Sequence, residues 1–137
     1  MENTVDRVEV AVALPVYGSY TYCMPESSAR PAAVGSRVVV PFGRRKVTGY
    51  ILGPGPAIDA KQIKPVLEVI DDTPLFPASM IPFFRWIADY YIHPLGEVIK
   101  CALPGGLTLH DVAVFCVSAA GKAALADPLV LPKEKEI

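Results

Sequence analysis

The sequence GSRVVVPFGRRKVTGYIL at residues 35–52 contains two runs of mostly β-branched and aromatic residues, separated by a glycine and three cations. Such runs favour β-strands, and a glycine between them favours a tight turn. The stretch therefore predicts a hairpin whose strands cover residues 37–42 and 47–52. Its tip would carry three positive charges, on Arg44, Arg45 and Lys46.

Three further strands are predicted on the two sides of this hairpin. Residues 8–12 alternate valine with other side chains, residues 19–24 place two tyrosines two positions apart, and residues 65–70 alternate again. A period of two is typical of strands with one face in a core. Fourteen prolines and ten glycines among 137 residues also favour short strands and frequent turns. We therefore expect a β-rich body.

Helices are predicted after this body. Apolar residues recur at helical spacing over residues 81–91, and a second short helix is expected over residues 96–103. Because an aromatic stripe on a helix more often packs into a core than stacks on bases, we expect most aromatic residues of the first helix to be buried. Residues 112–117 are compatible with a strand, and residues 118–125 with a helical turn. The fold class is therefore β-rich α+β.

The composition indicates one globular unit with a tail. Hydrophobic residues make up 52% of the chain and charged residues 20%, so the chain can bury a modest core. Cys23, Cys101 and Cys116 are far apart in the sequence, which favours neither a zinc site nor a disulfide framework. The polar N-terminus and the lack of a long apolar run predict no signal sequence and no membrane span, so a cytoplasmic location is expected.

Positive charge is concentrated in one part of the chain. The formal net charge is −1, but residues 37–64 hold six basic residues and one acidic residue, Asp59. A glycine followed by three cations at a hairpin tip exposes backbone N–H groups and positive charge together, as phosphate binding requires. Such a tip is equally typical of a solvated turn, and the residues alone favour neither interpretation. Tyr20 and Tyr22 could stack on bases, although one of them is expected to face the core.

The motifs of common enzyme classes do not occur in this sequence. There is no GxxxxGK[ST] loop to hold nucleotide phosphates and no GxSxG motif. His93 and His110 are the only histidines, and Cys101 has no readable catalytic partner. A histidine at a helix end, as His93 is, more often satisfies a local carbonyl than acts as a base. We therefore predict no catalytic residue, no metal site and no cofactor in this segment.

Several strings occur in the order and spacing of one known family. They are ALPV at 13–16, YTY at 20–22, GSRVVVPFG at 35–43, IKPVLEVID at 63–71, WIADYY at 86–91, HPLGE at 93–97 and ALP at 102–104. Together they resemble the start of the primosomal protein N′ (PriA) family of replication-restart helicases. The resemblance covers about residues 8–104, and its most specific strings are GxRVxVPFG and ADYYxHPxG.

The resemblance implies a 3′-end DNA-binding domain at residues 1–107, built as a small antiparallel OB-like barrel followed by short helices. In the family this domain captures the 3′ terminus of the nascent leading strand at stalled or branched forks. The family's pocket falls on Tyr20, Thr21, Gly43 and Lys64, with Arg44, Arg45 and Lys46 as accessory phosphate contacts at its mouth. Some members carry an aspartate where this chain has Thr21, and a carboxylate accepts from the 3′-hydroxyl more strongly than a threonine does.

Full-length members of the family also contain an ATPase motor and a zinc-binding cysteine cluster, which use ATP, magnesium and zinc. Neither is found in this sequence, so the resemblance implies a fragment or isolated domain without enzyme activity. Residues 108–137 would be a linker and the start of an incomplete winged-helix domain. Expected partners are branched DNA with a free 3′ end and other primosome and single-strand-binding proteins. Two rival hypotheses are a module that docks a replication partner such as single-strand-binding protein, and a small enzyme using His93 or Cys101.

Overall fold

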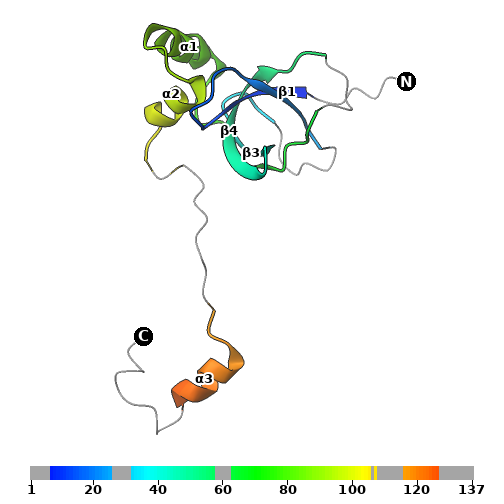
Figure 1. Cartoon of the computed structure of the whole chain (residues 1–137), viewed down its shortest axis with the longest axis vertical. Helices are drawn as coiled ribbons and strands as arrows, with labels where there is room; N and C mark the ends of the chain where they lie inside the picture. The colour runs from blue at the N-terminus through cyan, green and yellow to red at the C-terminus, as the bar shows by residue number, and fades with distance from the viewer. Residues whose placement is uncertain (1–6, 26–31, 58–62, 106, 108–115, 127–137) are drawn as a thin grey trace, which may run out of the picture.

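The structure is a computed structural model, and it describes residues 7–25, 32–57, 63–105, 107 and 116–126. Within these residues, strands precede the helices along the chain (Figure 1). The strands are β1 (Arg7–Val12), β2 (Tyr20–Cys23), β3 (Arg37–Phe42), β4 (Arg45–Pro54) and β5 (Glu68–Val69). A 3-10 turn, η2 (Ala78–Met80), leads into α1 (Ile81–Tyr90), followed by α2 (Leu95–Ala102) and α3 (Ala119–Ala126). The predicted β-rich α+β class is confirmed.

The strands form one antiparallel sheet in the order β2-β1-β4-β3-β5. The long strand β4 pairs with β1 on one side and with β3 on the other. The ladder does not close, but hydrogen bonds join the segment before β5 to β2. The Cys23 amide donates to the Lys64 carbonyl (3.1 Å), and the Val66 amide donates to the Cys23 carbonyl (2.9 Å). The result is a partly open barrel, consistent with the expected OB-like body.

Alternation along the strands divides the buried side chains into two clusters. One fills the barrel, and the other lies between the sheet and the helices α1 and α2, around Tyr50, Phe76 and Ile99. The barrel cluster consists of Val8, Val10, Val12, Tyr22, Met24, Val38, Val40, Ile51, Val66 and Val69. Full burial of side chains of this size contributes roughly 1.5–3 kcal/mol each. Both clusters therefore fix the sheet that carries the hairpin.

The helices α1 and α2 lie on the same side of the sheet (Figure 1). α1 begins with a proline, Pro82, in its first turn, where the missing N–H costs no hydrogen bond, and it buries Ile81, Phe84 and Ala88. α2 approaches β1 closely because residue 96 is a glycine. A Cβ atom on Gly96 would lie 1.7 Å from the Val12 carbonyl oxygen. No helix in the described part of the chain combines the length and apolarity needed to cross a membrane.

The last strand differs from its prediction. β5 contains only two residues and not the predicted residues 65–70. The residues before it bond to two different strands, because Val66 donates to Cys23 while the next amide, of Leu67, donates to the Val39 carbonyl (2.8 Å). This change of partner shortens the regular ladder. In the predicted tail, the helical turn coincides with α3, whereas residues 108–115 lie outside the described residues.

The expected burial of the aromatic residues on the first helix is wrong for most of them. Phe84 is buried, but Trp86, Tyr90 and Tyr91 are 57%, 67% and 68% exposed. A helix of ten residues that lies on one sheet buries only one face. On α1 the buried face carries Ile81, Phe84 and Ala88, so the other aromatic rings point to solvent.

Candidate nucleic-acid interface

A pocket of about 250 Å³ lies between β2 and the β3–β4 hairpin. Its lining comes from three separate parts of the chain. They are residues 20–22 of β2, residues 41–43 at the hairpin tip, and Lys64 in the segment before β5. The structure thus brings together all the residues that the sequence assigns to a DNA 3′-end pocket, namely Tyr20, Thr21, Gly43 and Lys64. Their role in DNA binding stays a prediction.

The two tyrosines of β2 have different environments in this pocket. Tyr22 is buried, and its hydroxyl donates a hydrogen bond to the Pro41 carbonyl (3.1 Å). Burial raises the pKa of Tyr22, with a smaller contribution from Tyr20. The Tyr20 ring is only partly buried and packs edge-to-face on Phe42, with ring centroids 5.1 Å apart and planes at 81°. Tyr22 is therefore the core-facing residue of the pair, and Tyr20 is the ring that a ligand can reach.

Gly43 opens the hairpin tip to a ligand. It is the first residue of the two-residue turn between β3 and β4, and its φ is +59°. Glycine at this position is typical of a type II′ turn, because other residues are strained at positive φ. A Cβ atom on Gly43 would have no heavy atom within 4 Å, so the backbone borders open space. A nucleotide can approach the main chain closely here.

Thr21 and Lys64 supply polar groups to the pocket. Neither side chain forms a hydrogen bond or ion pair with another residue that the structure describes. The backbone of Lys64 is fixed by the bond from Cys23, while its side chain is exposed. The part of the lining that the structure describes contains no carboxylate, so Lys64 gives it a positive charge. An ammonium group donates to phosphate or to a base acceptor, and a threonine hydroxyl both donates and accepts.

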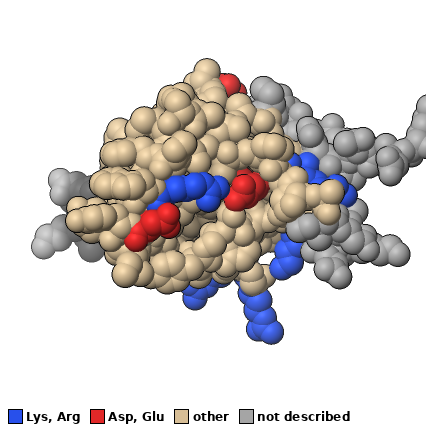
Figure 2. Space-filling model, turned by 90° about the horizontal axis from the view of Figure 1, so that it is seen from above, with Lys and Arg blue, Asp and Glu red and all other residues tan. Residues whose placement is uncertain are grey.

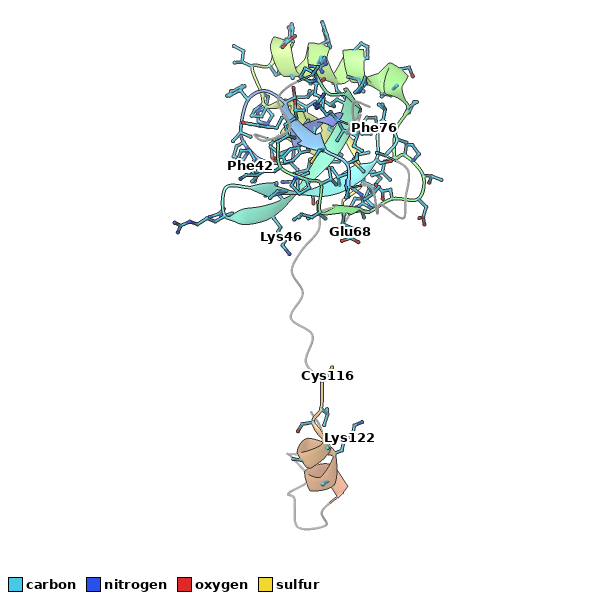
Figure 3. All side chains as sticks on the ribbon, turned by 90° about the vertical axis from the view of Figure 1, so that its right-hand side faces the viewer. Phe42, Lys46, Glu68, Phe76, Cys116 and Lys122 are labelled. Atoms are coloured by element: carbon cyan, nitrogen blue, oxygen red, sulfur yellow. The ribbon has the colours of Figure 1, made fainter. Side chains whose placement is uncertain are left out.

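The three cations of the hairpin tip border a different hollow. Arg44, Arg45 and Lys46 are exposed and line a space of about 560 Å³ together with Glu68. Figure 3 shows Lys46 and Glu68 at the end of the domain opposite α1. These cations are absent from the described lining of the Tyr20 pocket, and their role as accessory phosphate contacts stays a prediction. They lie next to that pocket along the chain and line a neighbouring surface.

Arg37, the first cation of the basic window, has a structural role. Its guanidinium forms an ion pair with the Asp71 carboxylate (2.6 Å), and its backbone amide donates to the same carboxylate (2.8 Å). The guanidinium also donates to the Leu107 carbonyl. The hydrogen bond to Asp71 raises the pKa of Arg37 further above its usual value. Arg37 thus ties β3 to two other segments of the fold.

The residues of the rival enzyme hypothesis are not brought together. His93 lines a hollow of about 360 Å³ whose lining includes Arg85 and Asp89 but not Cys101, which is exposed elsewhere on α2. The backbone amide of His93 donates to the Ala88 carbonyl (2.9 Å), but no hydrogen bond of its ring to a described residue is present. Among the residues described, no cluster of histidine, cysteine or acidic side chains has the arrangement to hold a metal ion.

A second candidate surface is an aromatic strip on α1, which we define as Phe83, Trp86 and Tyr90. The rings of Phe83 and Trp86 are stacked at 6.2 Å, and those of Trp86 and Tyr90 at 5.4 Å. All three side chains are at least half exposed. Figure 2 shows that the face on the side of the helices is mostly uncharged. Sequence reasoning assigned Trp86 and Tyr90 to the core and did not single out Phe83. Apolar residues on more than one side of a ten-residue helix are a signal for a second contact surface.

The barrel, the pocket and the neighbouring cations are arranged as in a small nucleic-acid-binding module. Residues 9–104 match the family of the PriA 3′ DNA-binding domain (3′BD), and the chain belongs to this family.

Relatives of the chain include replication restart protein PriA from several bacteria. The Haemophilus influenzae protein is 32% identical over 126 residues, which are 86% of this chain and 17% of that protein. The Treponema pallidum protein is 29% identical over 103 residues, 71% of this chain and 16% of the relative. The Synechocystis protein is 34% identical over 94 residues, 66% of this chain and 11% of the relative. The matched part therefore spans less than a fifth of these relatives.

Proposed function

We propose that this domain captures the 3′ terminus of the nascent leading strand at stalled or branched replication forks. By holding that terminus, it positions a replication-restart helicase for primosome assembly. The motor of that helicase would belong to the larger protein of which this domain is part. Residues 1–107 form the binding domain in this proposal, and residues 108–137 are the linker and the start of the winged-helix domain that follows.

One observation supports this proposal above all others. Tyr20, Gly43 and Lys64 are more than twenty residues apart in sequence, yet they line one pocket. The pocket is small and has an aromatic ring, an open stretch of backbone and a cation. These are the groups that a single nucleotide with a phosphate on one side requires.

Each residue has a distinct chemical task in the proposed complex. The Tyr20 ring stacks on the terminal base, which contributes roughly 1–3 kcal/mol per base in single-strand binding. Lys64 donates to a phosphate or base acceptor, and Gly43 leaves room for the sugar. The Thr21 hydroxyl accepts a hydrogen bond from the 3′-hydroxyl of the terminal deoxyribose. Because stacking and phosphate contacts do not read base edges, recognition depends on the end and not on an extended sequence.

The test measures fluorescence anisotropy on two labelled duplexes with recessed ends. The duplexes are identical except that one ends in a 3′-hydroxyl and the other in a 3′-phosphate. We expect tighter binding to the hydroxyl end, and a loss of about tenfold in that affinity for Lys64→Ala, since a hydrogen bond to a charged group contributes about 1.5–3 kcal/mol. Binding requires no nucleotide or metal, so EDTA should leave it unchanged.

Lys100→Ala serves as the matched control, because Lys100 is an exposed lysine on α2 away from the pocket lining. Its affinity should stay near that of the unchanged chain. Equal affinity for the two ends, with equal effects of Lys64→Ala and Lys100→Ala, would show that the pocket does not hold a terminus.

A second candidate function is docking of a replication partner such as single-strand-binding protein. The observation that favours it is the aromatic strip, because stacked and exposed Phe83, Trp86 and Tyr90 form an apolar surface suited to a partner. The strip and the pocket use different residues, so both functions can reside on one domain.

Competition separates these two functions. An acidic peptide carrying apolar residues should displace a partner bound to the strip, and an oligonucleotide with a 3′-hydroxyl should not. Trp86→Ala should weaken peptide binding and leave DNA binding unchanged. If the oligonucleotide alone competes and Trp86→Ala has no effect, docking through the aromatic strip is excluded.

A further inference from the structure

The β3–β4 hairpin tip separates two hollows. The Tyr20 pocket ends at Gly43, and the second hollow begins at Arg44, which is the next residue of the same two-residue turn. Consecutive Cα atoms are about 3.8 Å apart. The tip is therefore a thin ridge, and ligands in the two hollows would be close neighbours.

The register of the strands explains why the hollows have different chemistry. Lys46 and Thr48 are two residues apart on β4, so their side chains leave one face of the hairpin. Val47, between them, packs against the barrel core on the other face. Thr48 and Glu68 both pair with Val39, so Glu68 shares the face of Thr48. Figure 3 shows Lys46 and Glu68 pointing away from the body of the domain.

The charges of the second hollow suit a sugar-phosphate backbone. Among the described residues, its lining has three cations, one carboxylate and no aromatic ring. None of the three cations forms an ion pair with a residue in the described ranges. The Tyr20 pocket has the opposite balance, with aromatic rings and a single cation. One side of the ridge can hold a base, whereas the other can bind phosphates without reading sequence.

We propose that the second hollow binds the backbone of the template strand, opposite the nascent strand whose 3′ end occupies the Tyr20 pocket. This inference rests on the proposed function of that pocket. A strand that ends in the pocket has no phosphates beyond its terminus to reach across the ridge. The template strand continues past the terminus, so its phosphates are available there. The ligand of the domain is therefore a primer–template junction, with the hairpin tip between the two strands.

Glu68 has a defined place in this arrangement. It is exposed and lies among the cations of the second hollow. A carboxylate near a phosphate path repels the DNA backbone and so weakens binding to any duplex. Replacement of Glu68 by glutamine should strengthen binding to the template-paired DNA, since it removes this repulsion and keeps the shape of the side chain.

The test uses the full chain and one labelled strand with a 3′-hydroxyl, either alone or annealed to a longer template. Fluorescence anisotropy compares the unchanged protein with the double variant Arg44→Ala/Lys46→Ala and with Lys100→Ala as the control. We expect the unchanged protein to prefer the template-paired strand. The double variant should lose about tenfold in affinity for that DNA, and its salt dependence should fall by about two in slope, because each lost phosphate contact removes about 0.9.

Binding of the single strand alone should change less than about twofold in the double variant, since the strand's own contacts are in the pocket. Equal losses on the single and paired strands would overturn the proposal, because the cations would then contact the nascent strand itself. A lack of preference for paired DNA in the unchanged protein would also overturn it. Glu68→Gln provides a second measurement, with tighter binding to paired DNA only; no gain would contradict the proposal.

Failure of the pocket's own function is distinguishable from these outcomes. It would appear on the single strand without template, as equal binding of 3′-hydroxyl and 3′-phosphate ends and no effect of Lys64→Ala. The template proposal is tested by the difference between paired and single strands.

Discussion

Thr21 occupies a position where the resemblance implies an aspartate in some family members. Its hydroxyl lines the pocket and has no hydrogen-bond partner among the described residues. A carboxylate at this position would accept a charge-assisted hydrogen bond, which is about twice as strong as a neutral one. The strength with which the domain prefers a free 3′-hydroxyl should therefore depend on this side chain.

We predict that Thr21→Asp increases the preference for a 3′-hydroxyl over a 3′-phosphate by about fivefold. The carboxylate binds the hydroxyl and repels the terminal phosphate. Anisotropy titrations with the two ends measure this ratio, and Thr21→Asn is the control because it is similar in size to aspartate and neutral. If aspartate and asparagine change the ratio equally, charge at residue 21 does not select the terminus.

Tyr50 should give the domain a pH-dependent stability. Burial raises the pKa of Tyr50 from 10.0 to about 12. Its neutral form is therefore favoured in the folded state, and its contribution is fully present below about pH 10 and lost as the pH rises through about 12. Urea unfolding of Tyr50→Phe at several pH values above 9 should show a shallower loss of stability than the unchanged chain. If the unchanged chain and Tyr50→Phe lose stability equally as the pH rises, the loss comes from groups present in both, such as Tyr22, and not from Tyr50.

The residues of the pocket differ in how far sequence could predict them. The alternation of β2 indicates that Tyr20 and Tyr22 share a face, but only the packing shows that Tyr22 is the buried one. Glycine at residue 43 marks a hairpin turn in the sequence, because glycine adopts the positive φ that such turns require. No local rule could place Lys64 in the pocket of Tyr20, because their shared pocket depends on the bridge between β2 and the segment before β5. Its assignment came from the family resemblance.

Among the elements, α2 is the most sensitive to a single added carbon. Gly96→Ala would place a Cβ atom 1.7 Å from the Val12 carbonyl oxygen, so α2 must move away from β1. We predict a loss of about 1–3 kcal/mol or more in the free energy of unfolding, as for other overpacked sites. Urea denaturation measures it. Gly105→Ala, where the added atom has no neighbour within 4 Å, is the control, and similar stability of both variants would show that α2 does not dock this closely.

One ion pair reinforces the backbone hydrogen bonds between β3 and the segment after β5. Asp71→Ala removes the main partner of Arg37, whose side chain is 13% exposed. We predict a loss of about 3 kcal/mol in stability, since a nearly buried cation is left without compensation. Lys100→Ala removes the exposed pair with Glu97 (3.4 Å) and should cost less than about 1 kcal/mol. Equal thermal shifts in the two variants would argue against a structural role for the Arg37 pair.

Local patterns predicted where the strands and helices occur better than they predicted which elements contact one another. The hairpin and both helices follow from periodicity, glycine and proline. β5 was predicted too long because Val66 and Leu67 bond to different strands, and a sequence pattern does not show which partner an amide finds. The aromatic strip was assigned to the core because periodicity identifies apolar residues but does not show how many faces of a helix have a partner.

The whole molecule combines a barrel that holds the proposed end-binding pocket with a helical layer that presents an aromatic surface. The order of strands in the sheet places β2 and the hairpin tip at the pocket, although β1 and β4 separate β2 from β3 within the ladder. Curvature of the sheet is what brings these distant strands together. Neither the strand order nor this curvature was predictable from composition or spacing. Both determine which residues line the pocket.

The most direct test of the pocket is a ¹H–¹⁵N NMR titration of the full chain with a dinucleotide that has a free 3′-hydroxyl. A dinucleotide is too short to form a duplex, so it reports on the pocket alone. We predict that the largest amide shifts occur at Tyr20, Thr21, Gly43 and Lys64, and that a 3′-phosphate on the dinucleotide reduces them. Shifts confined to Arg44, Arg45 and Lys46, or to the aromatic strip, with no difference between the two ends, would contradict the account.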